Sequence, residues 1–147
     1  LPFIKEYKLQ LADLSIASLF TTPAPLTPTP IDFTGTGVGL IPYAPTWSDD
    51  GQHLVFLHHQ AGEARIYTCQ ASASEPVERY VVSGEDLERA WLMPQGPTTR
   101  LAFIQRAGAG AGALKLGDIN LTGTGLLSNV FDLAQLTKPK GRVSWGP

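Results

Sequence analysis

Glycine-containing breaks divide the sequence from Ile31 onward into short runs in which apolar and polar residues alternate. Alternation is typical of β-strands, because successive side chains of a strand point to opposite faces of the sheet. Glycine supplies the positive φ that tight hairpins require. With 12 prolines and 15 glycines the chain also has little room for long helices, so the expected fold class is all-β. We predict strands near Thr46 and over 53–59, 65–70, 77–82, 88–93, 100–106, 113–121, 129–136 and 142–145.

Length and charge restrict the classes of function. A chain of 147 residues is long enough for one ordinary domain, and a formal net charge of -2 gives no electrostatic reason to bind nucleic acid or an anionic membrane. The single cysteine, Cys69, lies in an apolar run and is interpreted as a core residue rather than a nucleophile. No apolar run is long enough to span a bilayer, and no signal peptide is visible. Because the first residue is Leu1 rather than Met, we expect that a start, a leader or an anchor has been removed, or that the chain is part of a longer polypeptide.

The first thirty residues differ from the rest. Residues 1–20 fit both strand and helix spacing, and we favour a strand through Leu11. Residues 21–30, TTPAPLTPTP, contain four prolines, which enforce an extended backbone and predict a linker or a strap across a surface. Such Thr/Pro segments are common in extracytoplasmic bacterial chains, so an extracytoplasmic location is expected. Residues 31–147 form the expected β-domain.

An internal repeat runs through this β-domain. PTWSDDGQHLVF, starting at Pro45, has a degenerate counterpart that starts at Arg89, and a third copy, GRVSWGP, begins at Gly141 and contains Trp145. Aligning the copies on tryptophan matches Trp47 with Trp91, Phe56 with Phe103, and Gly51 with Gly96. The tryptophans are 44 and 54 residues apart, close to the 40–45 residues of a four-stranded propeller blade. One tryptophan per unit could anchor the packing of neighbouring units.

The first copy resembles the repeat of TolB-type β-propellers, a WD-like family with a Pro-x-Trp-Ser-Pro-Asp-Gly core followed by two strands. Asp49 stands where the family has its second proline, and the second and third copies are more degenerate. The matching residues are Pro45, Trp47, Ser48, Asp50 and Gly51 in the core, Leu54 and Phe56 in the second strand, and Ile66 and Tyr67 in the third.

The resemblance implies a partial propeller of four-stranded antiparallel blades, about two blades and a fragment of a third. A propeller ring needs at least about four blades. We therefore expect other protein chains, or missing parts of the same chain, to complete it. The resemblance also implies a non-catalytic protein-binding or scaffold module, a fragment or subunit of a larger extracytoplasmic or membrane-associated assembly. Membrane contact would be indirect or through an absent anchor.

Residues in the predicted loop tips are the candidates for partner binding: Asp49, Asp50, Glu63 and Gln95. The charges at Glu85, Asp86, Glu88 and Arg89 are interpreted as a solvated cluster. The alternative function is the propeller portion of a peptidase-like enzyme whose catalytic domain lies outside this chain. The downstream sequence would distinguish the two hypotheses.

No catalytic residue, cofactor site or metal site is predicted. Adjacent His58 and His59 would point to opposite faces of a strand, and the acidic turn at Asp49 supplies few of the oxygens that calcium prefers. The glycines at 108, 110 and 112 could suggest a nucleotide-binding loop, but the following ALKLGDINL alternates like a strand, which favours a hairpin. No serine lies in a nucleophile elbow.

Overall fold

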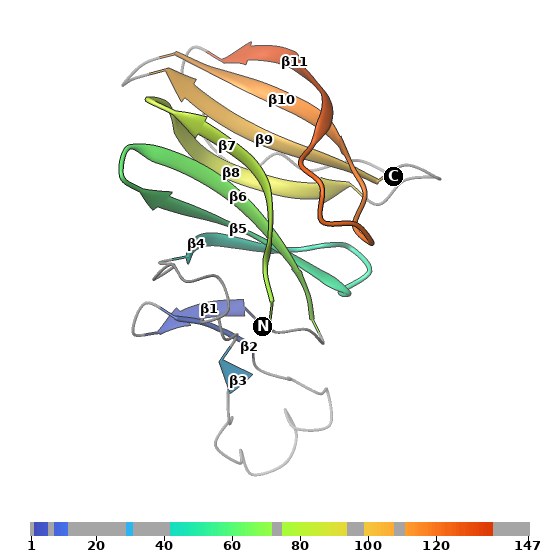
Figure 1. Cartoon of the computed structure of the whole chain (residues 1–147). Coiled ribbons are helices and arrows are strands. Elements are labelled where there is room, and N and C mark those ends of the chain that lie inside the picture. Colours follow the sequence, from blue (N-terminus) through green and yellow to red (C-terminus); the bar gives the residue numbers. More distant parts are fainter. Residues whose placement is uncertain are drawn as a thin grey trace, which may run out of the picture.

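The computed structural model describes residues 2–5, 8–11, 29–30, 42–71, 75–93, 99–107 and 111–136. All regular elements in these ranges are β-strands, which confirms the all-β fold class. Two four-stranded antiparallel sheets form the body of the molecule, and a small three-stranded sheet lies below β4 in the view of Figure 1.

Each large sheet is a meander in which strands adjacent in sequence pair with one another. Sheet I consists of β4 (Pro42–Trp47), β5 (His53–Gln60), β6 (Glu63–Gln70) and β7 (Val77–Ser83). Sheet II consists of β8 (Asp86–Met93), β9 (Thr99–Ala107), β10 (Ala111–Ile119) and β11 (Ser128–Leu136). The strands predicted between Thr46 and Leu136 are thereby confirmed, with ends that differ by up to two residues. The strand predicted over 142–145 lies outside the described residues.

The N-terminal segment forms two strands where one was expected. β1 (Pro2–Lys5) and β2 (Lys8–Leu11) pair antiparallel, with Pro2 opposite Leu11. The alternation of Tyr7, Leu9 and Leu11 did not reveal this reversal, because no glycine, proline or asparagine marks it. The last two residues of the proline-rich segment, Thr29–Pro30, form β3 and pair with β2. The remainder of that segment lies outside the described residues.

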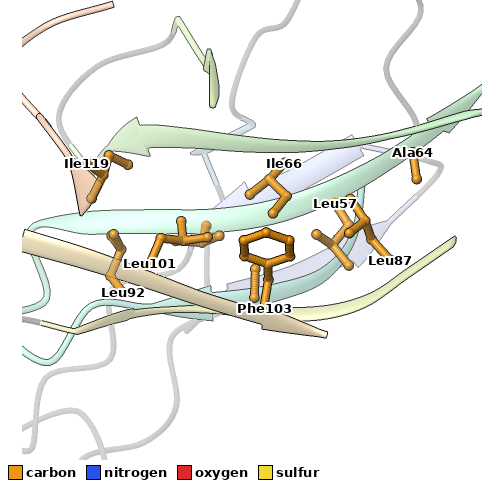
Figure 2. Packing of buried hydrophobic residues seen from close by; sticks show 10 residues of the cluster. Leu57, Ala64, Ile66, Leu87, Leu92, Leu101, Phe103 and Ile119 are labelled. Atoms are coloured by element: carbon orange, nitrogen blue, oxygen red, sulfur yellow. The ribbon is translucent and has the colours of Figure 1, made fainter. Parts of the chain in front are cut away.

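The two large sheets pack face to face. We call the face of sheet I that meets sheet II its front face, and the face of sheet II that meets sheet I its rear face. Figure 2 shows Phe103 from sheet II packed among side chains from both sheets. Full burial of each large apolar side chain contributes roughly 1.5–3 kcal/mol, so this interface is a principal source of stability. The buried cluster comprises Val55, Leu57, Ala64, Ile66, Leu87, Ala90, Leu92, Leu101, Phe103 and Ile119.

The strand registers test the repeat directly. Leu54 and Phe56 lie on the rear face of sheet I, away from sheet II, while Leu101 and Phe103 lie on the rear face of sheet II. Both pairs therefore lie on the same kind of face, as the match of Phe56 with Phe103 predicts; the correspondence of the two units itself stays a prediction. Gly96 lies outside the described residues, so its match with Gly51 stays a prediction.

The match of Trp47 with Trp91 is wrong by one residue. Trp47 pairs with Leu54, but Trp91 pairs with Ala102, the counterpart of Val55. Because a shift of one residue moves a side chain to the other face of a strand, the two indoles point to opposite faces of their sheets. The position equivalent to Trp91 in sheet I is Thr46, which pairs with Val55. Trp47 and Trp91 therefore do not anchor their sheets from equivalent positions, and Trp145 lies outside the described residues.

The hairpin between β5 and β6 permits a first prediction. Ala61 and Gly62 both have positive φ, 52° and 82°, and join strands paired at Gln60 and Glu63. Two positive φ values define a type I′ turn, for which Asn-Gly is the preferred sequence. Ala61→Asn should raise the free energy of unfolding by about 0.5–1 kcal/mol. Urea denaturation measures this change, and a decrease in stability would contradict the turn geometry.

Candidate functional site

The first strands of the two sheets are linked by side-chain hydrogen bonds. The Tyr43 hydroxyl donates to the Leu87 carbonyl oxygen at 2.9 Å, and the Thr46 hydroxyl donates to the Ala90 carbonyl oxygen at 2.6 Å. The register of β4 contains a bulge between Tyr43 and Thr46, where Ala44 has a positive φ of 48°. The bulge allows residues three apart to face the same neighbouring strand. As a result, β4 is fixed along β8.

A groove of about 430 Å³ opens where β4 and β5 meet the start of β8. His59 and Asp86 form an ion pair across it, with Nε2 and Oδ1 2.5 Å apart, when the imidazole is protonated. Both side chains remain accessible, at 45% and 60% exposure. The lining residues are Tyr43, His59, Asp86, Leu87, Glu88 and Arg106.

Charged groups on both sides of the groove are held by defined contacts. Arg106 donates from Nε and Nη2 to Oε2 of Glu88 at 2.9 and 2.7 Å. The Tyr43 ring lies 5.4 Å from the His59 ring, centroid to centroid. Burial, and secondarily the charge of Asp86, raises the pKa of Tyr43, so its hydroxyl remains a hydrogen-bond donor at neutral pH. Such a lining can form hydrogen bonds and ion pairs with polar side chains of a partner.

The predicted loop residues do not form one site. Asp49 and Asp50 lie in the turn before β5, whereas Glu63 begins β6 at the other end of that hairpin. The eight residues of β5 separate these ends by about 26 Å at the rise of an extended strand. Glu63 lies at the same end of sheet I as the groove, next to the hairpin that follows His59. Gln95 lies outside the described residues.

Asp50 organises its own turn. Its Oδ1 accepts hydrogen bonds from the Ser48 hydroxyl at 2.5 Å and from the Gln52 amide at 2.9 Å. Gly51 follows with a φ of 67°, a conformation that residues with a Cβ rarely adopt. Aspartate thus caps this turn while glycine takes the unusual conformation.

This cap predicts a pH dependence. The hydrogen bond from Ser48, followed by that from the Gln52 amide, lowers the pKa of Asp50 below its ordinary value of 3.8. A carboxyl whose folded-state pKa is lowered stabilises the fold above its unfolded pKa and loses that contribution as pH falls through the folded value. We expect Asp50→Ala to cost about 0.5–1 kcal/mol at pH 7, and less below about pH 4. Urea titrations across this range test it, with Asp49→Ala as control, and a difference independent of pH would contradict the role of the carboxylate.

Glu63 is bound to its neighbours on the rear face of sheet I. It accepts a hydrogen bond from the Ser83 hydroxyl at 3.2 Å and forms an ion pair with Arg65, which also pairs with Glu78. The hydrogen bond from Arg65, followed by that from Ser83, lowers the pKa of Glu63. Its carboxylate therefore links β6 to β7 through Ser83, and it also faces solvent.

The structure also places the cysteine, the histidines and the glycine-rich segment that the sequence analysis considered as nucleophile, metal ligands and nucleotide-binding loop. Burial raises the pKa of Cys69 to about 12, so its thiolate is scarce at neutral pH, as expected of a core cysteine. His58 pairs with Arg65 on the rear face, whereas His59 pairs with Ala64 and faces Asp86. Within the described ranges, no three His, Cys, Asp or Glu side chains are grouped as metal ligands. The glycine-rich segment after β9 leads into strand β10, which confirms a hairpin rather than the helix that a nucleotide loop requires.

The groove itself was not predicted from the sequence. His59 was considered as a metal ligand, and Asp86 and Glu88 were interpreted as part of a solvated charge cluster. Their proximity depends on the front face of sheet I meeting β8, a contact that no local pattern reveals. A second cavity, of about 590 Å³, lies at the other end of sheet II and is lined by Thr99, Asp118, Ile119, Asn120, Leu121, Thr122 and Ser128.

Comparisons with known proteins add no relative. No protein-family model matches the chain, and no curated protein or solved structure is significantly similar to it. In the described part of the chain, no helix has the length and apolar character needed to cross a membrane.

Proposed function

We propose that this chain is a non-catalytic protein-binding or scaffold module, built from propeller-type blades of the TolB kind and operating within a larger extracytoplasmic assembly. Its partners are other protein chains or further parts of the same polypeptide. The groove between β4, β5 and β8 is the proposed contact site for a partner. The proline- and threonine-rich composition of residues 21–30 supports the extracytoplasmic location.

The apolar front face of sheet II is the observation that carries the proposal. On sheet I, the front-face residues Val55, Leu57 and Ile66 pack against a second sheet. Their counterparts on sheet II are Ala102, Ile104 and Leu114, which are also buried and apolar. A unit that presents the same kind of face on both sheets is suited to continued stacking, as in propellers and other repeat proteins.

The position of the groove supports a binding role. It lies along β4 and β8, which are the first strands of their sheets and edge strands in both. Its two carboxylates can accept hydrogen bonds, its guanidinium can donate them, and its imidazole and phenol can do either. Residues of this kind can recognise polar side chains of a protein partner.

The side chains lining the groove also support a non-catalytic role. Among the described residues that line the groove, there is no serine, threonine or cysteine that His59 and Asp86 could activate as a nucleophile. Cys69 lies on the rear face of sheet I, opposite the face from which His59 projects. The alternative, an enzyme whose catalytic domain lies outside this chain, has no specific support from the groove.

Site-specific photo-crosslinking in the source organism tests the proposal. A benzophenone amino acid replacing the exposed His59 should give a discrete covalent adduct with a partner protein. The same amino acid replacing Asp49, at the far end of β5, is the matched control and should give little of that adduct. Equal adducts from both positions, or none from position 59, would overturn the assignment of the groove.

A second variant separates binding from folding. Asp86→Asn removes the charge of an exposed ion pair, whose contribution to stability is at most about 1 kcal/mol. The variant should therefore remain folded by circular dichroism while the yield of the position-59 adduct falls. An unchanged yield in the folded variant would show that the partner does not use this carboxylate.

A further inference from the structure

The turn after β10 contains the tripeptide Asn120-Leu121-Thr122, which is an acceptor motif for asparagine-linked glycosylation. The motif requires a serine or threonine two residues after the asparagine, with any residue except proline between them. The sequence has two asparagines, and only Asn120 meets this condition, because Phe131 stands two residues after Asn129. Such a tripeptide recurs by chance, so its position in the fold decides whether it can be used.

Hydrogen bonds hold the asparagine and the threonine of this motif together. Oδ1 of Asn120 accepts a hydrogen bond from the Thr122 amide at 3.0 Å and another from the Thr122 hydroxyl at 2.8 Å. Both bonds use the carboxamide oxygen, so neither occupies Nδ2, the atom that carries the sugar in a glycosylated asparagine. Both residues are exposed. The turn therefore presents the acceptor nitrogen and the required hydroxyl together at the surface.

The surroundings of the turn leave room for a bulky substituent. The cavity of about 590 Å³ at this end of sheet II is lined by Asn120 and six neighbouring residues. The hydroxyls of Thr99 and Ser128 and the carboxylate of Asp118 are in this lining and can form hydrogen bonds with a sugar. In β9, Thr99 lies about 23 Å from Arg106 of the partner groove, at the rise of an extended strand. A glycan on Asn120 is therefore attached away from the groove.

We propose that Asn120 is an N-glycosylation site, at which the substrate is an oligosaccharide carried on a polyprenyl pyrophosphate. An oligosaccharyltransferase directs Nδ2 to the anomeric carbon of the first sugar. A carbon–nitrogen bond forms there while the carbon–oxygen bond to the pyrophosphate breaks. The polyprenyl pyrophosphate leaves, and the carboxamide loses one proton to solvent. The inference rests on the proposed extracytoplasmic location, because this motif is used in secreted proteins.

Mass spectrometry of the full chain, purified from the source organism, tests the site. Trypsin should release residues 116–140 as one peptide that contains both asparagines. Fragmentation of this peptide should place an oligosaccharide on Asn120 and none on Asn129, the matched asparagine without a hydroxyl two residues later. An unmodified Asn120 would overturn the inference, as would a sugar carried instead by a serine or threonine of the same peptide.

Two substitutions of the threonine separate the motif from the fold. Thr122→Ala keeps the Asn120 side chain but removes the required hydroxyl, and it should abolish the mass increase. Thr122→Ser restores a hydroxyl and should recover it. Because Thr122 is exposed, both variants should remain folded by circular dichroism. Glycosylation of Asn120 that persists in Thr122→Ala would contradict the assignment.

Fractionation of the source cells distinguishes this inference from the proposed function. An unmodified chain found outside the cytoplasm would overturn the glycosylation site and leave the proposed location standing. An unmodified chain found in the cytoplasm would contradict both. Crosslinking from position 59 reports on the groove separately, because it does not depend on Asn120.

Discussion

Phe103→Ala is expected to lower the free energy of unfolding by about 3–5 kcal/mol. Phe103 is completely buried between the sheets, and its ring lies 4.6 Å from that of Tyr80, centroid to centroid. Truncation removes the burial of the ring and leaves a cavity that the flanking strands can fill only partly. Because domains are stable by only about 5–15 kcal/mol, much of the total stability would be lost. Urea denaturation followed by tryptophan fluorescence measures the change.

Phe131→Ala is the matched control for this substitution. Phe131 is in β11 of the same sheet, but it is 47% exposed. Its truncation should cost less than about 1 kcal/mol, because less apolar surface returns to water and no closed cavity forms. Similar losses for the two variants would show that Phe103 does not lie between packed sheets.

Arg79→Ala should lower the free energy of unfolding by about 3 kcal/mol. Arg79 is 2% exposed and is the bulged residue of β7, between the pairs formed by Tyr80 and Glu78. Its Nε donates to the Thr68 hydroxyl at 2.7 Å, and its Nη1 donates to the Gly125 carbonyl oxygen at 3.0 Å. In addition, the Arg79 carbonyl oxygen accepts a hydrogen bond from the Leu127 amide. The residue thus joins sheet I to the connection between β10 and β11.

Two further substitutions separate the contributions of this side chain. Arg79→Met keeps most of the buried stem but none of the donors, and should recover about half of the loss caused by alanine. Arg79→Lys keeps the charge, yet its ammonium cannot reproduce the planar arrangement of donors, so it should also remain less stable than the native protein. Chemical denaturation at neutral pH compares all three. An alanine variant within about 0.5 kcal/mol of the native protein would contradict the role of the guanidinium.

The strands could be predicted because their signals are local. The apolar residues 54–57 lie between Gly51 and Gly62, so the hairpin was evident from the sequence. The positions of the two tryptophans within their strands were not evident from the sequence. Trp47 is the last residue of β4, whereas Trp91 lies two residues before the end of β8. Aligning identical side chains assigned both to one face, although strand pairing places them on opposite faces. A repeat aligned on a single residue type cannot detect a shift of one residue.

The candidate site depended on information that the sequence does not display. The acidic turn was evident, and Asp50 does cap it, but its polar groups bind one another and the turn lies at the opposite end of β5 from the groove. His59 and Asp86 come together only because the front face of sheet I packs against β8. Arg79 was missed for a similar reason. Within VERYVVS it reads as a solvated strand residue, and only the bulge turns it inward.

Contacts between side chains across the two large sheets are the most direct test of front-to-rear packing. In nuclear Overhauser spectra of the full chain, we predict strong contacts from the Phe103 ring to the methyl groups of Leu57 and Ile66, and none between the rings of Phe56 and Phe103. Contacts between those two rings, or from Phe103 to the Trp91 indole, would mean that the faces are assigned wrongly. In that case neither the repeated unit nor the proposed binding module would stand.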